Sequence, residues 1–125
     1  MSTKLHDIPN NVTTLAGVTP RTATSTVTGS TIDLIHGDGR CFAIQQVGAV
    51  SGTSPSLAGK VQESADASTW ADVSGAAFTA VGSADNVQAI AFDRTQRYVR
   101  YVGTVTGTSP SFIVAVVVGE QKKQV

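Results

Sequence analysis

From residue 31 onwards the sequence is a series of short runs rich in β-branched residues, each ended by Gly, Ser, Asp or Pro. This pattern is typical of an all-β sandwich or barrel. No segment shows apolar residues at helical spacing behind a capping residue, so no helix is predicted. About eight antiparallel strands in one small domain favour a double-sheet sandwich of the jelly-roll type. The expected strands are residues 31–36, 41–50, 58–63, 71–73, 77–81, 87–92, 97–105 and 112–118.

The first thirty residues differ from the rest of the chain. They are rich in Thr, contain Pro9 and Pro20, and keep no helical or alternating period, which excludes long regular elements. We therefore predict an extended arm over residues 1–30, with one short strand near residues 22–28, and a β-sandwich domain over residues 31–125. A frayed terminus is the alternative; an arm that docks on a partner is favoured. The residues expected to contact that partner are Leu5, Ile8, Pro9, Val12, Leu15, Val18 and Arg21.

One sequence is repeated. Residues 47–56 (VGAVSGTSPS) recur as residues 102–111 (VGTVTGTSPS), and each copy lies between two predicted strands. Gly, Ser and Pro in this order favour a turn, so each copy is predicted to be a hairpin with Gly-Thr-Ser-Pro as its turn. The alternative is a pair of matched binding loops at one end of the sandwich.

The last predicted strand, residues 112–118 (FIVAVVV), is apolar on both alternating faces. An antiparallel sandwich strand usually leaves one face to water. The second face, formed by Ile113, Ala115 and Val117, must then be covered by the arm, by a loop or by another subunit. The preceding run alternates in the ordinary way, with Val99, Tyr101 and Val105 on one side of the strand. Tyr98, Arg100 and Thr104 point to the other side, with Val102 among them.

The charge balance excludes several classes of partner. Nine basic and nine acidic residues give a net charge of zero, and charged residues make up only 14% of the chain. Nucleic-acid binding depends on clustered Lys and Arg, so no nucleic-acid partner is expected. The N-terminus lacks the apolar region of a signal peptide, and no apolar run reaches the length of about 20 residues that spans a membrane. A surface with so little charge has weak protection against self-association, which suggests contact with other protein.

Catalytic and metal-binding patterns are weak. The two histidines are His6 and His36, and His36 has two carboxylates close to it in the sequence, those of Asp33 and Asp38, in a segment that is more typical of a Gly-Asp-Gly turn. Metal sites need three or four converging ligands, and the single cysteine, Cys41, excludes an intrachain disulfide. The carboxylates of Glu63, Asp66 and Asp72 fall mostly in turn-like sequence, where solvated carboxylates are common. We expect no enzyme activity, no cofactor and no metal.

Two further stretches carry a resemblance to a known family. Residues 61–73 (VQESADASTWADV) are followed by residues 92–101 (FDRTQRYVRY), the second Gly-Thr-Ser-Pro-Ser segment and an aliphatic strand. Together they resemble small β-sandwich virion proteins encoded in the head-gene clusters of tailed bacteriophages, over residues 47–118. The resemblance implies a cement or decoration protein on the outer capsid surface, made in the host cytoplasm, that ties major capsid subunits together. Its implied partners are the major capsid protein and itself, as a homodimer or homotrimer.

Other functions fit the same sequence. A neck, tail or other minor virion protein would share this composition. A carbohydrate-binding module would use Trp70, or Tyr98 and Tyr101, as exposed sugar platforms, whereas packing of Trp70 at the edge of the sandwich is favoured here. Many copies that bind the assembled lattice would stabilise the shell by mass action alone.

Overall fold

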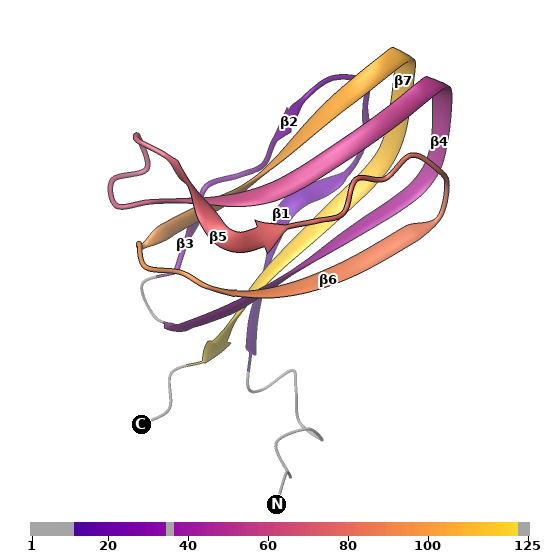
Figure 1. The fold of residues 1–125 in the computed structure, drawn as a ribbon. Coiled ribbons are helices and arrows are strands. Elements are labelled where there is room, and N and C mark those ends of the chain that lie inside the picture. Colours follow the sequence, from indigo (N-terminus) through magenta and orange to yellow (C-terminus); the bar gives the residue numbers. More distant parts are fainter. Residues whose placement is uncertain (1–11, 35–36, 123–125) are drawn as a thin grey trace, which may run out of the picture.

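The computed structural model describes residues 12–34 and 37–122 (Figure 1). Every regular element in these ranges is a strand, and every named strand pair is antiparallel, which confirms the all-β antiparallel prediction. The described residues contain no helix able to cross a membrane. The strands are β1 (Val12–Ala23), β2 (Val27–Thr28), β3 (Ile32–Asp33), β4 (Gly37–Ser64), β5 (Ala71–Ala77), β6 (Asn86–Asp93) and β7 (Tyr98–Lys122).

Two long strands, β4 and β7, form the frame of the molecule. They pair with each other along most of their length and turn back together at one end (Figure 1). The turn divides one hydrogen-bonded sheet into two layers. Layer A holds residues 37–51 of β4 and 111–122 of β7 between the edge strands β1 and β6. Layer B holds the other halves of β4 and β7 with β2, β3 and β5.

The repeated segments lie side by side where the two strands turn. Thr53 of β4 faces Thr108 of β7, and the backbone angles of the two copies match, with φ of 112° and 119° at Gly52 and Gly107. A Cβ on either glycine would approach the other copy's Ser carbonyl within 2.6–2.7 Å. The two copies of the repeat are therefore related by a local pseudo-twofold axis. Both β4 and β7 bend where these copies lie.

The hairpin prediction for these segments was wrong. Residues before each Gly-Thr-Ser-Pro pair with the other strand and not with the residues that follow: Val50 faces Phe112, and Leu57 faces Val105. The sequence of the turn is compatible with a bend because glycine accepts positive φ and proline lacks a ladder donor. Four of the eight predicted strands are consequently halves of β4 and β7, and the sandwich is one sheet folded over.

The predicted arm also needs correction within the described residues. Residues 12–23 are strand β1, paired with the C-terminal half of β7 from Val12↔Gln121 to Ala23↔Phe112. Two register shifts in this pairing surround Val18 and obscured the alternation that would have predicted a strand. Residues 1–11 lie outside the described residues.

The core lies between the two layers. Its apolar side chains come from all seven strands and include Tyr101, Phe112, Leu57 and four valines of β7. The Tyr101 hydroxyl, on layer B, donates a 2.5 Å hydrogen bond to Gln45 Oε1 on layer A. This bond ties the two layers together inside a mostly apolar interior. Burial also raises the pKa of Tyr101 above its usual value.

Candidate functional site

The outer face of layer A carries an unusual set of side chains, which we call the uncharged face. Strand alternation places every second residue of β7, β4 and β6 on it, and β1 completes one edge. Its members have no charge. They are Thr14, Ala16, Pro20, Thr22, Phe42, Ile44, Gln46, Gly48, Val87, Ala89, Ala91, Ile113, Ala115, Val117 and Gly119.

The strand register brings these residues into rows across the sheet. In one row Ala16 of β1, Val117 of β7, Ile44 of β4 and Ala89 of β6 face each other in turn. All four are aliphatic, so the row presents no hydrogen-bonding side chain from one edge to the other. Cross-strand aliphatic neighbours of this kind pack against each other and stabilise the sheet.

The next row contains an aromatic ring lying over a glycine. Phe42 of β4 faces Gly119 of β7, and a Cβ at Gly119 would meet the Phe42 ring at 2.2 Å. The missing side chain of Gly119 thus provides the space in which the ring lies flat against the sheet. This packing keeps the face smooth at that end.

The larger aliphatic side chains of the uncharged face remain open to solvent. Val87 is 64% exposed, Ile113 47% and Val117 38%. Their neighbours on β7, Val114, Val116 and Val118, are at most 1% exposed and form the core. The prediction that the second face of this strand needs a cover therefore identifies a surface that no described segment covers.

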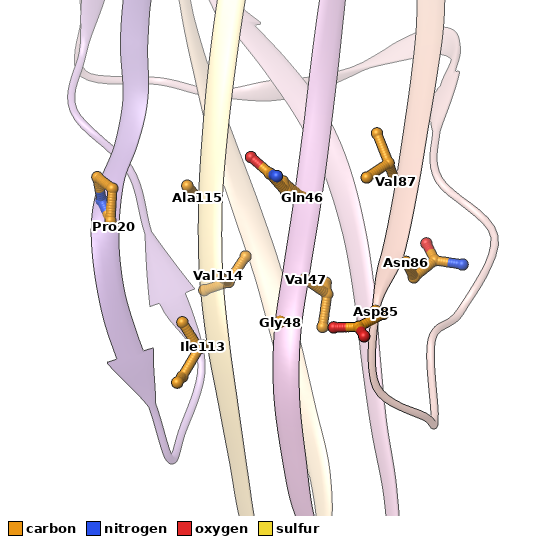
Figure 2. A pocket seen from close by; sticks show the side chains of 10 residues that line it. All are labelled: Pro20, Gln46, Val47, Gly48, Asp85, Asn86, Val87, Ile113, Val114 and Ala115. Atoms are coloured by element: carbon orange, nitrogen blue, oxygen red, sulfur yellow. The ribbon is translucent and has the colours of Figure 1, made fainter.

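A groove of about 440 Å³ crosses one end of this face (Figure 2). The residues that line it come from four adjacent strands and from the loop before β6, and Val87 stands at its edge. The Asp85 N–H donates to the Gly48 carbonyl at 3.1 Å, which holds that loop against β4. The lining residues are Pro20, Gln46, Val47, Gly48, Asp85, Asn86, Val87, Ile113, Val114 and Ala115.

Charged groups lie at the rim of the uncharged face. Asp85 is at the groove end, and the exposed pair Arg40–Asp93, at 3.1 Å, is at the opposite end. An apolar centre inside a polar rim is the usual arrangement of a protein–protein contact surface.

The residues predicted to contact a partner are placed in different environments. Val18 is buried in the core, and Leu15 packs against the core from its edge. Arg21 is exposed and donates to the Thr19 carbonyl and hydroxyl. Val12 begins β1, and Leu5, Ile8 and Pro9 lie outside the described residues.

The outer face of layer B, which we call the charged face, has the opposite character. Lys60 pairs with Asp72 at 3.1 Å, and the hydrogen bonds from Gln62 and then Lys60 lower the pKa of Asp72 below its usual value. The Arg100 guanidinium lies 4.4 Å from the centre of the Trp70 ring. Arg100 therefore occupies one side of the Trp70 ring.

The acidic turn before Trp70 is held by its own hydrogen bonds. The Asp66 carboxylate accepts from the Thr69 and Ser68 amides and from the Ser64 hydroxyl, and these bonds lower its pKa. Glu63 accepts from the Thr95 amide and hydroxyl. Both carboxylates therefore act as anchors for loops. Asp66 lies between β4 and β5, as predicted, whereas Asp72, which was also predicted to lie in loop-like sequence, is in strand β5.

A buried ion pair closes the end of the core opposite the repeats. Arg94 Nε lies 2.5 Å from Glu120 Oε2, and the Arg94 guanidinium also donates to the Leu34 carbonyl. The Cys41 thiol donates to the same carboxylate at 3.6 Å. Burial, followed by the negative charge of Glu120, raises the pKa of Cys41 from 9.0 to about 12, so the thiol is protonated at neutral pH and is a poor nucleophile.

The remaining catalytic candidates do not converge in the described structure. Asp33 forms a bidentate pair with Arg97, at 2.7 and 2.8 Å. His6 and His36 lie outside the described residues. Within residues 12–34 and 37–122 there is no group of three His, Cys, Asp or Glu side chains placed to hold a metal.

Sequence reasoning missed the β4 and β6 parts of the uncharged face. The signal was present in Phe42 and Ile44, which alternate with core residues, and in Val87, Ala89 and Ala91. Small alanines carry little weight in a strand pattern, and their role depends on the register with β7. The register became known only from the structure.

The molecule is thus an antiparallel all-β protein of two layers with one exposed, uncharged face. No protein-family model matches the chain, and neither does any curated protein. The chain is similar to the solved structure of the SPBc2 prophage-derived protein YomS, with 15% sequence identity and a TM-score of 0.49, over 88% of this chain and 94% of that one.

Proposed function

We propose that this chain is a structural protein of a phage virion, a cement or decoration protein that binds the outer surface of a tailed-phage capsid. The observation that carries the proposal is the uncharged face, because exposed patches of this kind are typical of proteins that work by contact with other protein, whether a neighbouring copy on the shell or the shell itself. The sequence resemblance to virion proteins gives the class of partner, the major capsid protein. In this proposal the chain works by binding and performs no chemistry.

The physical basis of such a function is simple. A protein that binds the assembled shell, and not its dissociated subunits, shifts the equilibrium toward the shell. A stiff two-layer sheet holds its contact surfaces in fixed positions, and many copies on one lattice gain from their high effective concentration. The N-terminal segment, with Leu5 and Ile8, is proposed to contribute capsid contacts.

The test is binding of the purified chain to capsids that lack it, followed by sedimentation of the particles. The N-terminal contacts are tested by Leu5→Asp with Ile8→Asp, two substitutions that precede the first residue of strand β1, Val12. We expect saturable binding at hundreds of copies per particle, weakened at least tenfold by the double substitution. A copy number of six or twelve would assign the chain to the neck or tail, and absence of binding to any part of the particle would refute the proposal.

Shell stability gives a second readout. Capsids that carry the chain should resist heat and osmotic shock better than capsids without it, because binding to the intact lattice opposes dissociation. Equal resistance of the two preparations would contradict a cement role even if binding occurs.

A further inference from the structure

We propose that the uncharged face is the contact surface for a second copy of this chain, related by a twofold axis, with Val87 of each copy inserted into the groove of the other. This inference rests on the proposed function only for its biological setting. The contact itself follows from the charge, shape and area of the face.

Because the described part of this face carries no charge, it favours a partner surface that is also uncharged. Its members are aliphatic, aromatic or small polar residues, and the charged groups lie at the rim. A partner surface with Lys, Arg, Asp or Glu at its centre would bury those charges without a counterion, which is costly. The uncharged face of a second copy would bring no charge into the centre of the contact. A twofold axis brings the same patch of both copies together.

The shape of the face is self-complementary. Val87 is the most exposed large apolar side chain among the described residues, at 64%. It stands at the edge of a groove of about 440 Å³ that Ile113 and Ala115 also line (Figure 2). A projecting aliphatic side chain beside an apolar groove lets two copies exchange these features reciprocally.

One amide sits near the middle of this contact. Gln46 lies between Ala115 of β7 and Val87 of β6 in the same row, and it is exposed. A Gln amide contains both donors and an acceptor. Across a twofold axis the Gln46 amides of two copies can therefore satisfy each other and fix the register of the contact, as a buried polar residue does in coiled coils.

The area of the face sets the strength of the contact. Four strands and the seven residues 113–119 of β7 span roughly 19 Å by 20 Å, or about 400 Å² in projection, from the usual strand spacings. This is about half of the 800 Å² per partner of a standard stable interface. The dimer should therefore be weak in solution, with a dissociation constant in the micromolar range. Neighbouring copies held on one lattice would associate more strongly.

The experiment is sedimentation equilibrium of the full chain from about 1 to about 300 µM, a range that brackets this constant. We expect the average mass to rise from monomer to dimer. Val87→Glu and Ala115→Lys should each weaken association at least thirtyfold while circular dichroism stays unchanged. Thr104→Lys, an equal change of charge on an exposed residue of β7 in layer B, is the matched control and should leave the dimer intact.

A mixing experiment identifies the geometry. Equimolar Val87→Glu and Ala115→Lys chains should form a heterodimer, because the carboxylate introduced in one copy would enter the groove that holds the ammonium group introduced in the other. Failure of the mixture to associate, a wild-type chain that stays monomeric at all concentrations, or a dimer lost only with Thr104→Lys would each overturn the inference.

Capsid binding is measured separately, so the two proposals fail independently. A monomer that still binds capsids removes the dimer and leaves the proposed function. A dimer that binds no capsid keeps the contact and removes the function. If Leu5→Asp with Ile8→Asp turns a monomeric wild type into a dimer, the N-terminal segment covers the face in its own chain, which also overturns the inference.

Discussion

The uncharged and charged faces are built on the same two strands, yet their side chains behave differently. On layer B each charged group has a nearby counterpart: Lys60 pairs with Asp72, and Arg100 stacks on Trp70. On layer A the exposed aliphatic side chains have one another as cross-strand neighbours among the described residues. One face is thus satisfied within the chain, and the other gains by contact with something outside it.

The turn at the two repeated segments separates the uncharged face from the charged face. A strand of 28 residues such as β4 could place all of its outward residues on one continuous surface. Because β4 and β7 turn together at Thr53 and Thr108, their two halves face outward in opposite directions. The protein can therefore expose one face to water and present the other to a partner, on a single rigid frame.

The largest expected effect distinguishes the two sides of β7 within layer A. Val114→Ala removes two buried methyl groups and leaves a cavity, so it should lower the free energy of unfolding by about 2–3 kcal/mol. Ile113→Ala, one residue earlier and 47% exposed, should change the stability of the monomer by less than about 0.5 kcal/mol. Urea denaturation at low protein concentration measures both.

A larger loss of stability from Ile113→Ala than from Val114→Ala would contradict the difference between the exposed and the buried side of β7. A large loss of stability from Ile113→Ala at concentrations where the chain is monomeric would mean that the face is covered within the chain. The same variant measured at high concentration should show the weakened dimer, which separates folding from association.

The second prediction concerns the tie between the layers that carry the two faces. Tyr101→Phe removes the donor to Gln45 Oε1, and Gln45 Nε2 is already buried without a hydrogen-bond partner among the described residues. The buried amide is then unsatisfied at both ends, which should cost on the order of 1–2 kcal/mol. Chemical denaturation should still show one transition, because the layers share β4 and β7. Two separate transitions would show that the faces belong to independent units.

Much of this architecture follows from the sequence. The β-branched runs predicted an all-β antiparallel fold, and the structure confirms it. Val99 and Tyr101 were placed together on one side of their strand, and both are 0% exposed. These predictions held because strand alternation is a local property that the sequence displays directly. The doubly apolar residues 112–118 indicated a second face that the arm, a loop or another subunit would cover, and this face is exposed among the described residues.

The rest depended on long-range pairing. A Gly-Thr-Ser-Pro segment is compatible with a hairpin or with a bend inside a strand, and the choice is made by which strand lies alongside. Here the neighbour of each copy is the other copy, 55 residues away in the chain. In β1 the register shifts around Val18 hid the strand in the same way. The alanines of β6 joined the uncharged face only through their register with Phe42 and Ile44.

The third prediction tests whether the charged face is satisfied within the chain. Arg100→Ala removes the stack on Trp70 and the hydrogen bond from Arg100 Nε to Gln62, and it should cost about 0.5–1 kcal/mol, the usual value for an exposed cation–π contact. Arg100→Lys keeps the positive charge and should recover part of the loss. Neither substitution should change the dimer in sedimentation equilibrium. A loss of association would show that the charged face, too, is a contact surface.

The smallest expected effect is a difference between the wild type and Asp72→Asn in how stability depends on pH. Hydrogen bonds from Gln62 and Lys60 hold the pKa of Asp72 below its usual value of 3.8, so the folded state favours the charged form. The stabilisation from Asp72 is then complete above pH 3.8 and is lost as the pH falls through the lower value of the folded state. Thermal melts from pH 6 to pH 2.5 should show a slightly steeper decline for the wild type than for Asp72→Asn. The members of the uncharged face do not titrate, and the carboxylates closest to the contact are Asp85, which lines the groove, and Asp93 at the rim. The dimerisation constant should therefore change little, and equally in the wild type and in Asp72→Asn, over the part of this range in which the chain remains folded. A dimer that dissociated near pH 4 in the wild type but not in Asp72→Asn would place Asp72 in the contact and reverse the assignment of the two faces.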